Sequence, residues 1–308
     1  MPTIPIVAVV GATASGKSEL ALDLAERLGG EIVNTDAMQV YRGMDIGTAK
    51  LPLAERRGIP HHLLDLLEVT EPATVAEFQR WAREVIADCR QRGVVPVLVG
   101  GSALYTRAIL DEFDFPGTDP EVRARYDAAL AELGAEALHA QLAERDPEAA
   151  AGIIPTNGRR IVRALEVIEI TGRPFTATLP PPRYADPATV QIGVDIDRPT
   201  LDARIAARVE HMWELGFVEE VRALAGRGLR EGLTANRALG YRQILAFLDG
   251  EITEAEAKER TITGTRRFAR RQDSWFRKDE RVSWVHHDDP ERVEHALAAI
   301  RQAAVTQA

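Results

Sequence analysis

Apolar residues near the start of the chain fall into short runs that are separated by helical patterns. The first run, residues 4–10, is rich in β-branched residues and predicts a buried strand. Leu20, Leu24 and Leu28 follow at helical spacing and end at Gly29, which predicts a helix. Strands that alternate with helices in this way are typical of a parallel sheet with both faces covered.

Two more short apolar runs, residues 31–35 and 97–99, predict further strands of this sheet. Asp36 directly follows the first of them. Pro96 lacks an N–H group, so we expect it to start the second strand rather than lie inside it. Thr74 has the Glu three residues later that completes a capping box, which predicts a helix between the two strands.

A glycine-rich motif lies between the first strand and the first helix. Residues 11–18 read GATASGKS and fit the phosphate-loop pattern G-x-x-x-x-G-K-[ST]. In such a loop, backbone N–H groups and the positive end of the helix dipole converge on phosphate oxygens. Lys17 supplies a charge for the terminal phosphate, and the Ser18 hydroxyl suits a Mg²⁺ that bridges phosphates. The predicted phosphate-binding residues are Gly11, Ala12, Thr13, Ala14, Ser15, Gly16, Lys17 and Ser18, and Ser18 is also the predicted metal ligand.

The pattern changes near residue 116. Residues 119–172 show only helical periodicity, and the proline-rich residues 180–187 close this region before a strand pattern resumes at 190–196. We therefore predict an α/β fold, a P-loop NTPase-like parallel sheet with helices on both faces, plus an all-helical insertion domain. The predicted core is residues 1–115 and 189–308 with two or three helices after the last strand, and the predicted insertion is residues 116–188.

Composition limits the partners that the chain can bind. No apolar stretch reaches the length of a membrane span, which favours a cytoplasmic protein with no membrane contact. The net charge of −9 argues against binding nucleic acid through the whole surface, so a polyanion requires local patches. Two patches qualify, one at Arg159, Arg160 and Arg163 and one at residues 266–278, where six cations are interleaved with aromatic residues that we expect in the core.

The single cysteine and the paired histidines have structural interpretations. Cys89 has no second cysteine for a disulfide or a multi-cysteine zinc site, and it falls on the apolar side of a predicted helix, so we expect it to be buried. His61 and His62 lack cysteine partners at zinc-ligand spacing, which favours a structural role.

Asp36 is the candidate general base, because ligands of open α/β sheets bind at the carboxyl ends of the strands. It is also suited to cap the next segment or to bind magnesium through water. A regulatory GTPase is disfavoured, since no lysine stands in an Asn-Lys-x-Asp guanine reader, and a mechanical ATPase is disfavoured because residues 97–99 end in Gly-Gly-Ser rather than a magnesium-binding Asp. A small-molecule or nucleoside kinase with Asp36 as base and a non-catalytic nucleotide-binding adaptor both remain open.

The order and spacing of several motifs resemble the tRNA dimethylallyltransferase family across nearly the whole chain. The matching segments are GATASGKS at residues 11–18, DAMQVY at 36–41, MDIGTAK at 44–50, HHLLD at 61–65, LVGGSALY at 98–105, residues 119–123, RRIVRALEV at 159–167, GYRQ at 240–243 and residues 266–277. Ala12, Ala37 and Ser102 depart from the usual proline, serine and threonine of that family, and none of these changes removes a required chemical group.

The resemblance implies a donor, an acceptor and a set of site residues. The phosphate loop would bind dimethylallyl diphosphate with Mg²⁺, and Asp36 would accept a proton from the adenine amine of an adenosine in the anticodon arm of tRNA. The implied catalytic residues are Asp36, Lys17 and Ser102. The residues that the resemblance places against tRNA are Asp36, Ala37, Met38, Gln39, Ser102, Arg123, Arg159, Arg160, Ile161, Val162 and Arg163. We expect a monomer.

Overall fold

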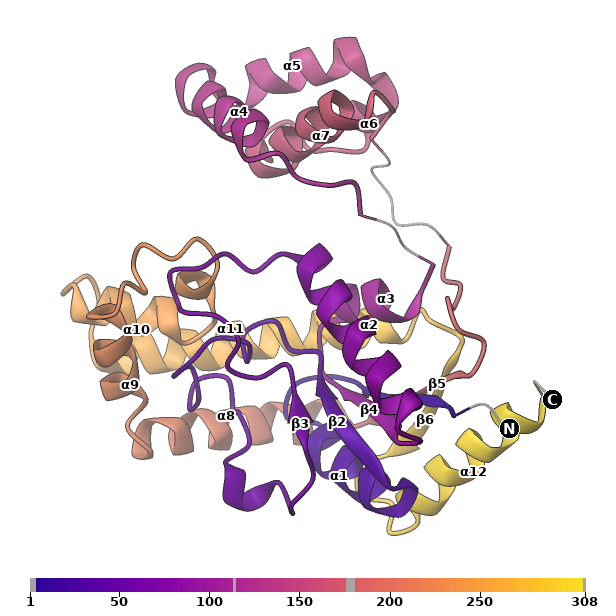
Figure 1. Ribbon diagram of the computed structural model, residues 1–308. Helices are drawn as coiled ribbons and strands as arrows, with labels where there is room; N and C mark the ends of the chain where they lie inside the picture. Colours follow the sequence, from indigo (N-terminus) through magenta and orange to yellow (C-terminus); the bar gives the residue numbers. More distant parts are fainter. Residues whose placement is uncertain (1–3, 113–114, 176–180, 307–308) are drawn as a thin grey trace. The chain divides into compact units, whose positions relative to one another are not determined.

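A computed structural model describes residues 4–112, 115–175 and 181–306. The chain forms two compact units, one of Met1–Glu112 with Tyr184–Ala308 and one of Phe113–Arg183. Figure 1 labels their helices and strands. Within the described residues, no helix combines the length and the apolar composition needed to cross a membrane.

The first unit is built on a parallel sheet with the strand order β3-β2-β4-β1-β5-β6. The strands are β1 (Ile6–Val10), β2 (Gly30–Asn34), β3 (His61–His62), β4 (Val95–Val99), β5 (Thr189–Asp195) and β6 (Val282–His286). The helices of this unit are α1 (Lys17–Leu28), α2 (Val75–Gln91), α3 (Ala103–Leu110), α8 (Arg198–Glu214), α9 (Phe217–Ala225), α10 (Tyr241–Leu248), α11 (Glu254–Phe276) and α12 (Arg292–Thr306).

Alternation along the strands supplies one core on each face of the sheet. In β1, Val7 and Val9 pack with residues of α1 and α12, whereas Ala8 and Val10 pack with residues of α2, α3, α9 and α10. Because both faces are covered, every residue of β1 is buried. The predicted α/β fold with a parallel sheet and helices on both faces is confirmed.

The second unit contains four helices, α4 (Pro120–Leu133), α5 (Ala135–Arg145), α6 (Pro147–Ala151) and α7 (Gly158–Thr171), within its described residues. Their apolar faces meet around Leu138, Leu142 and Leu165, which are fully buried. The predicted boundaries at 116 and 188 differ from this unit at both ends, and residues 184–188 belong to the first unit. Residues 176–180, which include the first residue of the predicted proline-rich segment 180–187, lie outside the described residues.

Several local predictions are settled by the structure. The Thr74 cap is confirmed, since its side chain accepts a hydrogen bond from the N–H of Glu77 at the start of α2. The prediction for Pro96 is wrong, because it is the second residue of β4 and pairs with Glu31. It is tolerated there because β1 pairs with β4 only from Val97 onward, so Pro96 precedes the part of β4 that is paired on both sides. The short strands β3 and β6 were not predicted, and five helices rather than two or three follow β5.

Gly240 occupies a backbone position that only glycine fits. Its φ is +87°, and a Cβ at this position would lie 2.6 Å from the ring of Phe217. Gly250 also has a positive φ, +74°, but a Cβ there meets nothing within 4 Å. Substituting each of the two glycines by alanine therefore distinguishes the effect of backbone strain alone from the effect of strain combined with steric overlap.

We predict that Gly240→Ala destabilises the protein more than Gly250→Ala does. Both changes strain the backbone, but only the first also forces a buried aromatic ring to move, which costs a further ~1–3 kcal/mol. Thermal unfolding should give a midpoint about 2–10 °C lower for Gly240→Ala than for Gly250→Ala. Equal midpoints would contradict close packing of Phe217 against this glycine.

Candidate active site

The phosphate loop lies between β1 and α1, as its sequence predicts. Gly11 has a φ of +138°, and a Cβ there would lie 3.1 Å from the carbonyl oxygen of Val194. Gly16 precedes α1 with a φ of 100°. The loop curls around its own lysine, since Lys17 Nζ donates to the carbonyl oxygen of Ala12 over 2.7 Å. The backbone path of a phosphate-binding loop is thus formed by the protein alone.

Positive charge is concentrated beside this loop. Burial, followed by repulsion from Arg208 of α8, lowers the pKa of Lys17 to about 7, although Asp36 opposes the shift. The pKa of Arg208 is itself lowered, first by burial and then by Arg204. Arg204 reaches the loop from the same helix and lies 3.5 Å from the carbonyl oxygen of Ser15. Cations that depress one another's pKa in this way gain most from a bound polyanion.

Asp36 is fixed by the residues on either side of it. Asn34, the last residue of β2, accepts from the N–H of Asp36 over 2.8 Å, and its amide nitrogen donates to the carbonyl oxygens of Asp36 and Leu63. Asp36 Oδ1 in turn accepts from the N–H of Met38 over 2.9 Å. Burial raises the pKa of Asp36, with the Met38 N–H and Lys17 acting against it. A carboxylate with a raised pKa is a stronger proton acceptor than an exposed aspartate.

The turn after β4 approaches the same place. A Cβ on Gly100 would lie 2.1 Å from Thr35 Oγ1, and one on Gly101 would lie 2.3 Å from Gln272 Nε2. Gln272, from α11, accepts from the N–H of Thr13 in the phosphate loop over 2.8 Å. Ser102 precedes α3 without a capping hydrogen bond from its side chain. The two glycines therefore allow the turn, the phosphate loop and α11 to meet.

Asp36 and Ser102 share a cavity of about 550 Å³ with Thr13 of the phosphate loop. Its apolar lining includes Met38, Tyr105, Ile205, Val209, Met212, Phe217 and Phe268. Four arginines complete its lining, namely Arg208, Arg237, Arg242 and Arg271. A mostly apolar cavity with a few polar and charged groups is the usual form of a small-molecule site.

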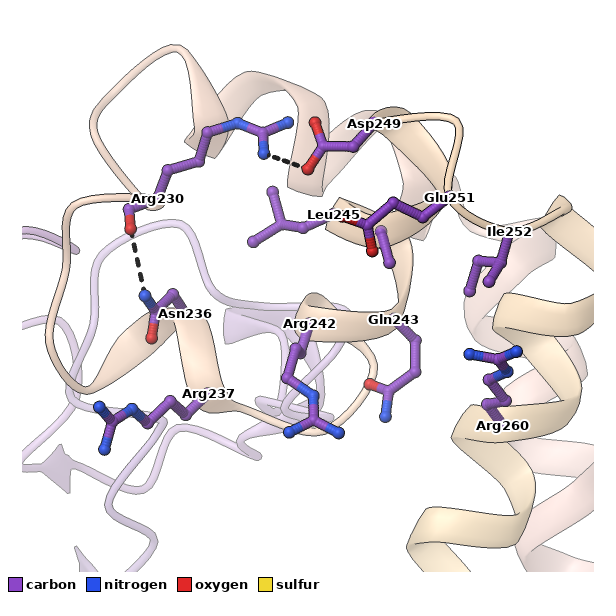
Figure 2. A pocket seen from close by; sticks show the side chains of 11 residues that line it. Arg230, Asn236, Arg237, Arg242, Gln243, Leu245, Asp249, Glu251, Ile252 and Arg260 are labelled. Atoms are coloured by element: carbon purple, nitrogen blue, oxygen red, sulfur yellow. Dashed lines mark hydrogen bonds and ion pairs between the residues drawn. The ribbon is translucent and has the colours of Figure 1, made fainter. Parts of the chain in front are cut away.

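Two further hollows adjoin this cavity through shared residues. Lys17, Ser18 and Arg208 line one of about 610 Å³ on the other side of the phosphate loop. Figure 2 shows the other, of about 780 Å³, where Arg237, Arg242 and Gln243 lie opposite Arg260 of α11. Arg208 thus links the cavity to the phosphate loop's outer side, and Arg237 and Arg242 link it to an arginine-lined surface.

Not every side chain of the arginine surface is available to a ligand. Arg230 donates to Asp249 over 2.7 Å, and its carbonyl oxygen accepts from Asn236, as the dashed lines in Figure 2 mark. Arg237 and Arg242 instead point along the rim of the hollow in that view. They supply the positive charge that is shared with the cavity of Asp36.

The aromatic residues of 266–278 are only partly in the core. Phe276 is buried, but Trp275 is 44% exposed, so the expectation of a core position is wrong for this tryptophan. Phe268 lines the cavity, with the Arg271 guanidinium 5.8 Å from its ring centre. Three other cations of this segment are bound within the protein: Arg266 and Arg270 bind Asp202 of α8, and Arg277 binds Asp195 of β5.

The remaining predicted RNA contacts lie in the second unit. Arg159 and Arg160 are exposed in the first turn of α7. Ile161 and Val162 are fully buried in the core of that unit, so they offer RNA no side-chain surface. They face inward because helical spacing places them on the apolar stripe of α7.

Arg123 and Arg163 converge on an internal carboxylate of this unit. Both donate to Oε2 of the fully buried Glu166, over 3.2 and 2.8 Å. Arg163 also donates to the carbonyl oxygens of Pro116 and Gly117. The Arg163 guanidinium therefore holds the start of the helical unit, and a contact with RNA stays a prediction.

His62 and Cys89 both contact the carboxylate of Glu31. His62 Nε2 lies 2.8 Å from Glu31 Oε2, and Cys89 Sγ lies 3.6 Å from the same oxygen. Arg92 donates to both oxygens of Glu31, so this carboxylate is engaged in an ion pair. Cys89 is buried as expected.

A sequence pattern marked the phosphate loop, Asp36 and Ser102. Asp36, Ser102 and Thr13 of the loop line one cavity, whereas Lys17 and Ser18 line the adjoining hollow. Arg208, Gln272, Arg237 and Arg242 also line the cavity of Asp36 and were not assigned a role from the sequence. Arg242 stands inside the GYRQ segment and Gln272 inside residues 266–277, and these two matching segments were the available signals. Together the fold and the site define a P-loop protein that holds a carboxylate of raised pKa, Asp36, beside its phosphate loop.

Comparison with known proteins identifies the family. The model of the IPP transferase family matches residues 39–279, more than half of the chain. A tRNA dimethylallyltransferase of Nocardioides sp. is 70% identical over 296 residues, which cover 96% of this chain and 96% of the relative. One of Thermobifida fusca is 64% identical over 300 residues, covering 96% and 94%. The chain therefore belongs to the tRNA dimethylallyltransferase family.

Solved structures share this fold. The crystal structure of the full-length tRNA isopentenylpyrophosphate transferase from Bacillus halodurans matches with a TM-score of 0.73 and 37% identity, covering 99% of both chains. A eukaryotic dimethylallyltransferase acting on tRNA matches with a TM-score of 0.82 at 24% identity, covering 98% of this chain and 79% of that one. The second match shows a common fold.

We predict that affinity for inorganic diphosphate depends on the ionisation of Lys17. A bound anion raises the pKa of this amine above 7, so the amine's contribution is complete below about pH 7. As the pH rises through the raised pKa, this contribution falls by at most about tenfold per pH unit. Calorimetric titration from pH 6 to 9 should show this decline as the ratio of wild-type to Lys17→Met affinity, which cancels the ionisation of diphosphate itself.

Lys17→Arg is the matched control, because a guanidinium remains charged throughout that range. Its affinity ratio to Lys17→Met should be flat. A wild-type ratio that is equally flat would show that Lys17 is fully protonated in the free enzyme.

Proposed function

We propose that this enzyme transfers the dimethylallyl group of dimethylallyl diphosphate to the exocyclic amine of the adenosine 3′-adjacent to the anticodon in tRNA, releasing diphosphate. The observation that carries the proposal is one cavity lined by Asp36, by Thr13 of the phosphate loop and by arginines. Family membership supports the same reaction.

The donor binds with its diphosphate on the phosphate loop and its allyl group in the apolar part of the cavity. Backbone N–H groups of the loop, Lys17 and Arg208 neutralise the leaving group. Ser18, exposed in the first turn of α1 and on the hollow that it shares with Lys17, would supply one hydroxyl ligand for Mg²⁺. This fits an ion that takes one or two protein ligands and completes its shell with phosphate oxygens and water. When bound, Mg²⁺ stabilises the charge that develops on the diphosphate.

The acceptor amine attacks the allylic carbon that carries the diphosphate. A nitrogen–carbon bond forms while the carbon–oxygen bond breaks, and the electrons of the broken bond go to the diphosphate oxygen. The amine loses its proton to Asp36, whose raised pKa favours this transfer. Ser102, on the same cavity, is placed to donate to or accept from the substrate.

RNA binding relies on the local arginines, since the chain is acidic overall. Arg237, Arg242 and Arg271 at the cavity bind the backbone beside the target nucleotide, and Arg159 and Arg160 of the helical unit bind further phosphates of the anticodon arm. The target adenine leaves its stack, because a stacked base cannot present its amine to an enclosed carbon. We propose a monomer that acts in the cytoplasm, where its tRNA substrate is made.

We predict that wild-type protein transfers label from dimethylallyl diphosphate to tRNA and that Asp36→Asn does so about 100- to 10,000-fold more slowly. The amide keeps the size of the carboxylate but does not take up a proton at neutral pH. Single-turnover rates measure the loss, and both proteins should bind inorganic diphosphate alike. Rates within about threefold of each other would exclude Asp36 as the base.

The same assay distinguishes the alternative function. Consumption of ATP by the wild-type protein, with no label in tRNA, would favour a small-molecule kinase. The comparisons do not favour this alternative, because the related proteins are named as transferases that modify tRNA.

We predict that Arg159→Ala with Arg160→Ala weakens tRNA binding and flattens its salt dependence. Each lost phosphate contact lowers the slope of log affinity against log salt by about 0.7 for single-stranded RNA, so the double variant should lose about 1.4. Arg173→Ala removes one exposed cation of the same unit and shows how far the loss of a single charge by itself alters the slope. A double variant with the same slope as Arg173→Ala would show that these two arginines do not touch RNA.

A further inference from the structure

One carboxylate of α9 collects four hydrogen-bond donors from two other segments. Glu220 accepts from the backbone N–H groups of Asp45, Ile46 and Gly47 over 3.1, 2.7 and 3.2 Å. It also accepts from the hydroxyl of Tyr241, at the start of α10, over 2.6 Å. Three consecutive backbone N–H groups make a concave site for an anion, and here the protein fills it with its own carboxylate.

We propose that Glu220 is a positioning residue that sets the two walls of the acceptor cavity relative to each other. The inference rests on the proposed function, because it assigns a role to the cavity that contains Asp36. Glu220 is not among the residues lining that cavity, so it acts through the segments that it binds.

The first wall is the segment that follows the three N–H groups. Gly47, Thr48 and Ala49 all line the cavity. The carbonyl oxygen of Thr48 accepts from the side-chain amide of Gln39 over 3.0 Å. Gln39 belongs to the turn that begins at Asp36, and its own N–H donates to the carbonyl oxygen of Asp36. A displacement of residues 47–49 is therefore expected to move Gln39 and, with it, Asp36.

The second wall is the start of α10. Tyr241 is followed directly by Arg242 and Gln243, which both line the cavity. Burial, and then the charge of Glu220, raise the pKa of Tyr241 well above its usual range, so its hydroxyl keeps its proton and donates. The bond between Tyr241 and Glu220 consequently fixes the place from which Arg242 and Gln243 project.

The backbone of Gly47 is closely packed between the two walls, so it has little room to move while Glu220 binds it. A Cβ on Gly47 would lie 2.2 Å from the ring of Phe217 and 2.5 Å from that of Tyr241. The two rings pack edge to face, with centres 5.0 Å apart. The backbone of Gly47 therefore packs directly against the rings of Phe217 and Tyr241, and Tyr241 begins the second wall.

A second anchor keeps the segment attached when Glu220 is changed. Lys50 is buried, and its amine donates to Asp45 and Asp65 over 2.6 Å each and to the carbonyl oxygen of Tyr41 over 3.0 Å. Because these bonds do not involve Glu220, its substitution should displace the middle of the segment without releasing its ends.

Glu220→Gln tests this role, because it keeps the shape but replaces one accepting oxygen with an NH₂ group that faces the same donors. We expect transfer at saturating tRNA and donor to slow by about 10- to 100-fold, since displacements of about 1 Å have effects of this size. Affinity for inorganic diphosphate should stay within about twofold, because the phosphate loop is not touched. Amide hydrogen exchange at residues 45–47 should become faster, with the strands of the sheet unchanged.

Glu214→Gln, an exposed residue of α8 whose side chain contacts His211, is the matched control and should behave as wild type. A wild-type transfer rate in Glu220→Gln would overturn the proposal, and so would a slow variant that has also lost diphosphate binding. If Glu220→Gln does not fold, Tyr241→Phe decides: slower transfer with intact diphosphate binding supports the role, and an unchanged rate refutes it. Absence of transfer by the wild type would instead refute the proposed function.

Discussion

The carboxyl ends of parallel strands meet at one edge of the sheet, and the active site depends on this constraint. The phosphate loop follows β1, Asp36 follows β2 and the turn with Ser102 follows β4. These three strands are neighbours in the order β2-β4-β1. Strand pairing thus brings residues that are far apart in the chain to one cavity. This placement does not depend on contacts between the side chains of the site.

Positive charge is concentrated at this edge of the sheet, although the protein as a whole is negatively charged. The chain carries a net charge of −9, yet cations are close together here: Arg208 contributes to lowering the pKa of Lys17, and Arg204 contributes to lowering that of Arg208. Asp36 partly offsets them, and its carboxylate remains a base because burial raises its pKa. One acid among several cations suits a reaction that releases a polyanion and transfers one proton. Under the proposed function, the overall negative charge leaves the arginine-lined surfaces as the sites for RNA.

The sequence predicted those features that depend on local patterns. The phosphate loop and the Thr74 cap each follow from residues within one short segment, and the parallel sheet follows from the alternation of such segments along the chain. Strand β3 has only two residues and β6 shows no unbroken apolar run, so neither produces a periodic signal. Arg208 looks like an ordinary helix residue in the sequence, and Gln272 lies in residues 266–277, where the arginines rather than this glutamine suggest a binding role. Only the packing of α8 and α11 places the two residues at the cavity.

The boundary of the helical unit shows the same limit. Tyr184 was assigned to the insertion because prolines precede it, but it pairs with Asp111, and the N–H of Ala185 donates to the carbonyl oxygen of Leu110. Arg281 then binds the buried Asp111 over 2.7 Å and lies over the ring of Tyr184. Arg281, about a hundred positions after Tyr184, therefore contacts both of the chain segments that lead into and out of the unit.

Long-range closure of this kind also explains how the site is completed. The early part of the chain supplies the phosphate loop, Asp36 and the segment around Gly47, and these carry the recognisable motifs. The later part supplies Arg208, Phe217 and Glu220 from helices without a recognisable motif, and Tyr241 from the GYRQ segment, whose pattern does not indicate what the tyrosine contacts. Because Glu220 binds backbone N–H groups rather than side chains, no residue type in residues 45–47 reveals its partner. The residues proposed for catalysis can therefore be predicted from motifs in the first third of the chain. Their positions relative to the later helices depend on contacts that form only when the chain folds.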